Sequence, residues 1–105
     1  MKIIETDNAP KAIGTYSQAV KVNGFLFISG QIPLDPSTME LVEGIENQIN
    51  QVFENINQIL KADGMDFSNV VKLSVLLEDL SHFEKVNEIM ASIFSKPYPA
   101  RAAYE

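Results

Sequence analysis

The sequence contains no cysteine and a single histidine, and this scarcity limits the chemistry open to it. Without cysteine there can be no disulfide, no thiolate nucleophile and no cysteine-ligated metal or iron–sulfur cluster. One histidine also disfavours a histidine-based zinc site. We therefore expect a protein that works without a metal and without a cofactor.

Basic residues are scarce too, with 8 lysines and arginines against 14 acidic residues and a net charge of −6. This charge repels phosphate backbones and anionic membranes, so we expect no general nucleic-acid binding. The first residues lack an apolar signal core, and no apolar run approaches the roughly 18 residues that a membrane helix needs. We expect a cytoplasmic protein, and residues 1–105 are enough for one domain.

Asn23-Gly24 separates two β-rich runs, residues 19–22 and 25–29. This dipeptide tolerates the positive φ angles of a type I′ turn, so the sequence predicts a two-residue hairpin. Directly paired residues share a face of the sheet, which predicts a polar cluster at the open end of the hairpin. Its predicted members are Tyr16, Gln18, Ser29 and Gln31.

Two segments have the apolar spacing of amphipathic helices. The first runs from Ile45 to Lys61, with Asp63-Gly64 as a stop, and we expect its polar face, which includes Asn55, to be solvated. The second runs from about His82 to Phe94, and Ser81-His82-Phe83-Glu84 matches a capping box at its start. His82 is therefore expected to be an exposed cap residue, not a catalytic base.

Residues 69–78 alternate with period two, which predicts a strand with Val71 and Leu73 on its core face. The opposite face is only half apolar and could meet a neighbouring subunit. With a short N-terminal strand, the hairpin and a final strand, the order of elements predicts an α+β domain in which one sheet carries two helices on one face. A bare second sheet face favours a closed oligomer.

The final strand is expected at residues 100–104, because Pro97 and Pro99 hold the chain extended before it. Arg101 would project from this strand between small residues, which leave room beside its guanidinium. A planar guanidinium is well suited to holding a carboxylate through two parallel hydrogen bonds. The alternative for a lone arginine is a solvated surface side chain.

Several short motifs occur along the chain in a characteristic order and spacing. They are Asn8-Ala9-Pro10, residues 13–18, residues 28–33, Val86-Asn87 and Tyr98-Pro99-Ala100-Arg101. Together they resemble the RidA (YjgF/YER057c/UK114) family of reactive-intermediate deaminases. The resemblance implies a chorismate-mutase-like fold, a homotrimer with clefts between adjacent subunits, and hydrolysis of enamines and imines to 2-oxo acids and ammonia.

Carried over by position, the resemblance makes Arg101 the carboxylate anchor, with the amides of Gly30 and Ala103 beside it. Tyr16 and Ser29 resemble the polar residues around the ligand, and Tyr16 joins Arg101 as a catalytic candidate. Ala103 stands where many members have cysteine, but a backbone contact survives that change.

The family continues beyond Glu105 into a further strand, whose glutamate is thought to orient or activate water. We therefore expect residues 1–105 to form a RidA-like domain without that final strand, either as a shortened version of a longer protein or as a protein that has lost the group.

Three functions remain open at this point. The first is a cofactor-free 2-iminobutanoate/2-iminopropanoate deaminase. The second is a non-catalytic module that binds small 2-oxo or other carboxylic acids, which the missing glutamate favours. The third is a ribonuclease or translation inhibitor, which the acidic balance and the lack of a histidine pair oppose.

Overall fold

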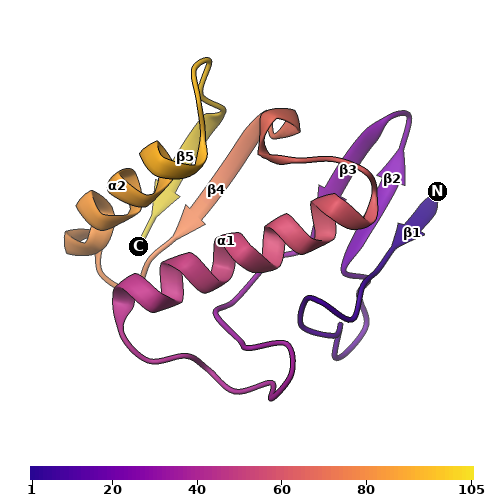
Figure 1. Ribbon diagram of the computed structural model, residues 1–105, viewed down its shortest axis with the longest axis horizontal. Coiled ribbons are helices and arrows are strands. Elements are labelled where there is room, and N and C mark those ends of the chain that lie inside the picture. The colour runs from indigo at the N-terminus through magenta and orange to yellow at the C-terminus, as the bar shows by residue number, and fades with distance from the viewer. The chain divides into compact units, whose positions relative to one another are not determined.

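Two units, Met1–Met65 and Asp66–Glu105, make up the residues 1–105 that the computed structural model describes (Figure 1). The first unit contains an antiparallel sheet in the order β1-β2-β3 and a long helix, α1. The bounds of its elements are β1 Lys2–Ile4, β2 Ala19–Val22, β3 Phe25–Ile28 and α1 Ile45–Ala62.

The predicted hairpin is confirmed. Asn23 and Gly24 have φ angles of 52° and 82°, which are the positive values that a type I′ turn requires. Val22 pairs with Phe25, and Val20 pairs with Phe27, in the predicted register. The register fixes which residues share each face of the sheet.

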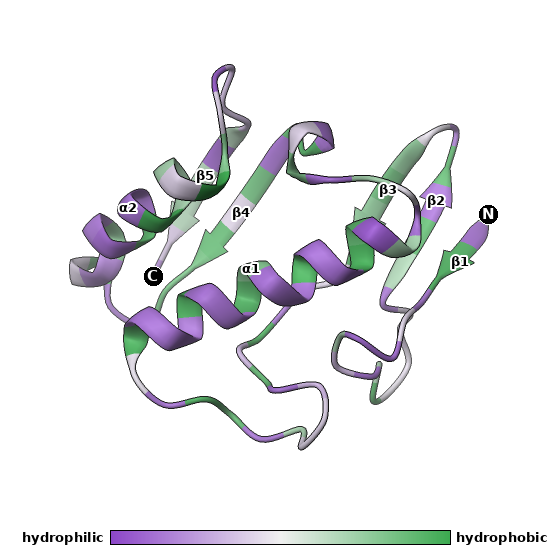
Figure 2. Ribbon diagram, in the orientation of Figure 1, coloured by the Kyte–Doolittle hydropathy of each residue, from purple (hydrophilic) through white to green (hydrophobic).

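Helix α1 packs its apolar stripe onto one face of this sheet, where Ile59 joins Ile4 and Ala19 in a buried cluster. Figure 2 shows the apolar residues recurring along α1 between hydrophilic ones. The helix ends one residue after the predicted end, and Gly64 of the predicted stop has a positive φ of 70°, which glycine adopts readily. The buried apolar residues of the unit are Ile4, Ala9, Ala19, Ile49, Phe53, Ile59 and Leu60.

Asn55 corrects the expectation that the polar face of α1 is solvated throughout, because its side chain is fully buried. Its Nδ2 donates to the carbonyls of Ile32 and Leu34, at 3.3 and 3.1 Å. Its Oδ1 accepts a hydrogen bond from Gln51 Nε2 at 2.9 Å. Burial is tolerated because these bonds replace water, and they fasten the loop after β3 to the helix.

The second unit pairs two parallel strands and carries the second helix. Its core comprises Val86, Ile89, Met90 and Phe94, and the Phe94 ring meets Phe67 edge-on at 5.3 Å between centroids. The bounds of its elements are β4 Lys72–Leu76, α2 Phe83–Ile93, β5 Ala100–Tyr104 and two 3₁₀ turns, Phe67–Asn69 and Leu80–His82.

The capping box predicted at Ser81 and Glu84 is wrong. Asp79 is the cap instead: its carboxylate accepts a hydrogen bond from the Ser81 amide at 2.8 Å. This places Ser81 inside the 3₁₀ turn that precedes α2, so its amide is capped and its hydroxyl does not cap the helix. His82 occupies the N-cap position of α2, half-buried rather than exposed, and makes no side-chain capping bond.

Strand β4 is shorter than the predicted strand of residues 69–78: the turn Phe67–Asn69 takes its first residue, and residues 70–71 and 77–78 lie outside the strand. Within β4 the alternation is confirmed, since Leu73 and Val75 are half-buried and Leu76 is 78% exposed. Val71, predicted on the core face, precedes the strand and is 70% exposed.

The α+β class is confirmed, with two helices packed with β-structure. The strands, however, form a three-stranded and a two-stranded sheet, not the single continuous sheet expected. Strand β3 hydrogen-bonds only to β2, and β4 only to β5, so no strand pairing joins the two sheets. Neither helix combines the length and apolar character needed to cross a bilayer.

Candidate functional site

Arg101 lies on β5 with alanines before and after it, as the sequence predicts. It pairs in parallel register with Leu73 of β4, and its side chain is exposed. Arg101 is also the only arginine of the chain. The strand and its small neighbours therefore present one isolated guanidinium.

Three side chains of α2 surround this guanidinium. Asn87 Oδ1 accepts a hydrogen bond from Arg101 Nη1 at 2.5 Å, and Met90 Sδ accepts a second from the same nitrogen at 3.6 Å. The Arg101 Cζ lies 4.5 Å from the centroid of the Phe83 ring, a cation–π distance. Arg101 is thus a held side chain, which separates it from a freely solvated surface arginine.

The backbone of β5 adds a donor next to Arg101. The Ala100 amide donates to Val71 O, and the Tyr104 carbonyl accepts from the Leu77 amide, each at 2.9 Å. In a parallel ladder, alternate residues bond to the same neighbour, so the even-numbered residues of β5 face β4. The amide of Ala103 therefore points to the other edge of β5, which no strand of this chain covers.

Ser29 and its neighbours form part of the predicted polar cluster in the first unit. The Ser29 amide donates to Gln18 O at 2.9 Å, and its Oγ donates to Ser17 O at 2.6 Å. Gln31 Nε2 donates to Ser29 O at 3.0 Å. Gly30 follows in an exposed position with open space where a side chain would be. The structure thus brings Gln18, Ser29 and Gln31 together.

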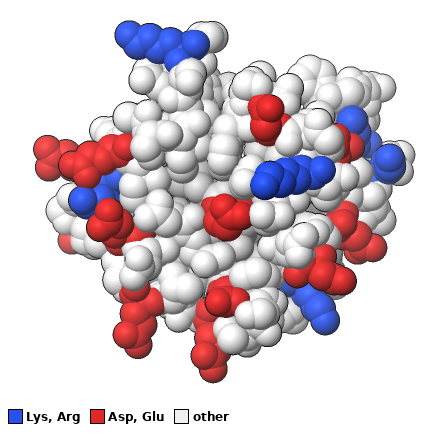
Figure 3. Space-filling view, viewed as in Figure 1, with Lys and Arg blue, Asp and Glu red and all other residues white.

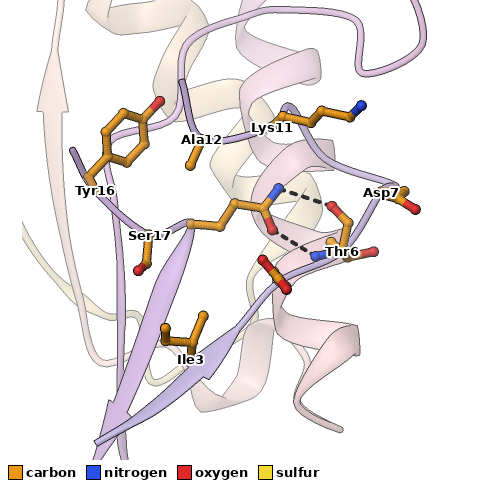
Figure 4. A pocket seen from close by; sticks show the side chains of 9 residues that line it. Ile3, Thr6, Asp7, Lys11, Ala12, Tyr16 and Ser17 are labelled. Carbon is orange, nitrogen blue, oxygen red and sulfur yellow. Dashed lines mark hydrogen bonds between the residues drawn. The ribbon is translucent and has the colours of Figure 1, made fainter. Parts of the chain in front are cut away.

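Tyr16 does not join that cluster through its hydroxyl, which accepts a hydrogen bond from the Ile13 amide at 3.2 Å. Its side chain is 51% exposed and lines a hollow of about 560 Å³ (Figure 4). Figure 4 shows Lys11 and Asp7 on the wall of the same hollow. Tyr16 is therefore placed at an open, polar surface of its own unit.

Gln18 fixes the loop that carries Tyr16. It is buried, with 5% of its surface exposed. Its Nε2 donates to the carbonyls of Thr6 and Pro10 at 3.0 and 2.8 Å, and its Oε1 accepts from the Thr6 amide at 2.7 Å. Figure 4 shows both bonds to Thr6. A buried, fully bonded amide of this kind holds a loop in one conformation.

The sequence did not reveal Phe83 and Met90 as neighbours of Arg101, because both belong to the apolar stripe of α2. The only available signal was their spacing, since Phe83, Asn87 and Met90 recur at i, i+4 and i+7 and so share one helix face. Asn87, which lies on the same face of α2, accepts a hydrogen bond from the predicted anchor, Arg101.

One carboxyl near the start of α2, that of Asp79, has a shifted pKa. The hydrogen bond from the Ser81 amide, then that from the Ser81 hydroxyl and a smaller contribution from the charge of His82, lower the pKa of Asp79. Figure 3 shows acidic side chains interspersed with basic ones, with no continuous basic patch on the face in view. No group of three histidine, cysteine, aspartate or glutamate residues in the chain is arranged to hold a metal ion.

Comparison with known proteins adds independent findings. The family model described as Endoribonuclease L-PSP matches residues 6–105. The 2-iminobutanoate/2-iminopropanoate deaminase of Mus musculus is 51% identical over 105 residues, covering 99% of this chain and 78% of its own.

Two solved structures are similar over the same span. RidA from the Antarctic bacterium Psychrobacter is 54% identical, with a TM-score of 0.95, covering 99% of this chain and 85% of its own. TdcF of E. coli, solved with bound serine, is 36% identical with a TM-score of 0.93, covering 99% of this chain and 84% of its own.

Proposed function

Because the chain belongs to the RidA (YjgF/YER057c/UK114) family, we propose that it is a 2-iminobutanoate/2-iminopropanoate deaminase. The reaction hydrolyses an enamine or imine to a 2-oxo acid and ammonia, without a cofactor. The observation that carries the proposal is the held guanidinium of Arg101, on the strand that also presents the outward-pointing amide of Ala103 two residues further on. The names of the similar proteins support it.

In the proposed mechanism, Arg101 binds the substrate carboxylate and the Ala103 amide donates a further hydrogen bond. Water attacks the C=N carbon, and the electron pair of the C=N bond moves to the nitrogen, which takes up a proton. The attacking water loses a proton, which gives a carbinolamine. Its hydroxyl then gives up the remaining proton to the nitrogen as the C=O bond forms and the C–N bond breaks, and ammonia leaves. Holding the carboxylate fixes the reacting carbon relative to water, which lowers the entropic barrier.

Tyr16, Ser29 and Gly30 remain proposed contributors. Tyr16 has an exposed hydroxyl-bearing ring, and Gly30 has an exposed backbone. The Ser29 hydroxyl gives its proton to Ser17 O, so it is free to act only as an acceptor. We propose polar contacts to the ligand for these residues, with Tyr16 as the one that acts on the reacting atoms.

A homotrimer is part of the proposal, with sites in the clefts between subunits. The face of the sheet opposite α1 is apolar and exposed, with Phe25 and Phe27 62% and 60% exposed and Ile3 54% exposed. Contiguous apolar surface of this kind is typical of a protein–protein contact. We propose that this face forms the contact between copies. We also propose that residues 1–105 form a single domain and that the protein is cytoplasmic.

An assay with an amino-acid dehydratase that generates the imine tests the reaction. The chain should speed 2-oxo acid release above the rate in buffer, Arg101→Ala should not, and Asn50→Ala, a change at an exposed position of α1, should match the parent. Binding of pyruvate without any acceleration would instead identify a carboxylate-binding module and overturn the deaminase proposal.

Ribonuclease activity is the less supported alternative, despite the description of the family model. The chain carries one histidine and a net charge of −6. A titration with RNA at several salt concentrations separates it from the other two functions, because binding to phosphates weakens steeply as salt rises. We expect no binding at low salt.

A further inference from the structure

The Arg101 guanidinium makes both of its hydrogen bonds within the chain from one nitrogen. A guanidinium carries five N–H donors: two on Nη1, two on Nη2 and one on Nε. Asn87 Oδ1 and Met90 Sδ both accept from Nη1. The two hydrogens of Nη1 are therefore engaged, whereas those of Nε and Nη2 are directed elsewhere.

This pattern restricts how a carboxylate can bind. A two-point contact needs one hydrogen from each of two neighbouring nitrogens, which allows an end-on fork from Nη1 and Nη2 or a side-on fork from Nε and Nη2. The end-on fork would have to displace Asn87 or Met90. The side-on fork is complete without any rearrangement.

The Phe83 ring adds a second restraint. It lies 4.5 Å from Cζ, so it holds one side of the guanidinium, while Asn87 and Met90 hold one corner of it. Met90 is 7% exposed and belongs to the core, so its sulfur is a fixed point of the unit. The rotamer freedom of Arg101 is therefore reduced before any ligand arrives, which favours binding.

We propose that Phe83, Asn87 and Met90 are positioning residues that orient Arg101 to receive the substrate carboxylate side-on, through Nε and Nη2. The inference rests on the proposed function, because it specifies how the proposed anchor is used. These residues on one face of α2 thus determine which edge of the guanidinium the carboxylate binds, and so which nitrogens donate directly to it.

Nuclear magnetic resonance tests the choice of edge directly, because Arg101 is the only arginine and ¹⁵N-arginine labelling gives a single side-chain Nε–H signal. Saturation with pyruvate should shift this signal. Pyruvamide, which has the same skeleton without the carboxylate, should leave it in place. An unshifted signal in a sample that binds pyruvate would overturn the side-on assignment.

Substitutions test the positioning role by calorimetric titration with pyruvate. Asn87→Ala should weaken binding about tenfold, as for loss of a hydrogen bond to a charged group. Phe83→Leu should weaken it about two- to fivefold, whereas Phe83→Tyr, which keeps an aromatic ring, and Asn50→Ala should bind like the parent. Parent-like affinity in both Asn87→Ala and Phe83→Leu would refute the role.

The two proposals fail in different ways. If Arg101→Ala binds pyruvate as well as the parent, the anchor itself is wrong and the proposed function loses its main support. A different result separates the second proposal. If Arg101→Ala loses binding, but Asn87→Ala and Phe83→Leu bind pyruvate like the parent and the Nε–H signal does not shift, only the positioning inference is wrong. The Nε measurement uses the unsubstituted chain, so it stays decisive even if a variant unfolds.

Discussion

Lys21 Nζ lies 2.8 Å from a carboxylate oxygen of Asp63, so an ion pair joins strand β2 to the residue that follows α1. The Asp63 side chain is 7% exposed, whereas that of Lys21 is 31% exposed. The carboxylate has therefore lost most of its water, and the ammonium supplies the compensating charge.

Lys21→Met should lower the free energy of unfolding by about 3 kcal/mol, because it leaves the buried Asp63 carboxylate without its partner. Urea denaturation measures the change. The double variant Lys21→Met, Asp63→Asn should recover much of the loss, since the unpaired charge is then absent. A single variant as stable as the parent would mean that the pair is solvated in solution.

Asn55→Ala should cost about 1 to 3 kcal/mol, because it removes a fully buried amide that donates hydrogen bonds to the carbonyls of Ile32 and Leu34. Asn55→Asp should cost more, since it points a carboxylate at those carbonyls. Asn50→Ala, an exposed change on the same helix, should stay within about 0.5 kcal/mol of the parent. Equal effects at the two asparagines would contradict the buried bonding at Asn55.

The sequence predicted those elements whose signals are local. Asn23-Gly24 specifies its turn by backbone conformation alone, and the apolar period of α1 fixes the helix to within one residue at its end. The position of Arg101 on a strand of small residues follows equally from the two prolines before it. Each of these features depends on neighbours within a few positions.

Features that depend on distant partners escaped prediction. The sequence pattern places Asn55 on a solvated polar face, because no neighbouring residue indicates that the loop after β3 will cover it. Phe83 and Met90 read as core residues, because their contact with Arg101 spans more than ten residues of sequence. The cap was misplaced because Asp79 and Ser81 offer competing caps two residues apart.

Asp79→Ala should destabilise the chain at neutral pH more than Ser81→Ala does, because the Asp79 carboxylate is the cap and the Ser81 hydroxyl only adds a hydrogen bond to it. The pKa of Asp79 is lowered in the folded protein, mainly by the Ser81 amide. The stabilisation is therefore present above the pKa of the unfolded chain and disappears as the pH falls through the lower, folded value.

Thermal unfolding across a pH series measures this difference. The parent and Asp79→Ala should differ at pH 7 and converge at the acid end of the series. A constant difference at every pH would show that packing, not the charge of the cap, accounts for the loss.

Arg101→Lys should weaken binding of 2-oxobutanoate about ten- to a hundredfold, because an ammonium keeps the charge but cannot form the planar two-point contact. Calorimetric titration measures the affinity, and Lys72→Arg, a change at an exposed position of β4, is the control. If Arg101→Lys bound like the parent, charge alone would suffice and the geometry of the fork would be irrelevant.

Phe27→Glu should dissociate the proposed trimer. Phe27 is 60% exposed and pairs with Val20, which also pairs with Ile3, so the three form one apolar strip across the sheet. A carboxylate buried at a subunit contact would lose its water without gaining a partner, while on an isolated subunit it would stay solvated. The fold of the subunit should therefore survive.

Native mass spectrometry at micromolar concentration distinguishes the outcomes. The parent and Asn50→Glu, which adds the same charge at an exposed position of α1, should both be trimers, and Phe27→Glu should be a monomer with unchanged helical circular dichroism. A trimer in all three samples would place the contact on another surface. A monomeric parent would refute the trimer itself, and with it the clefts in which the proposed reaction takes place.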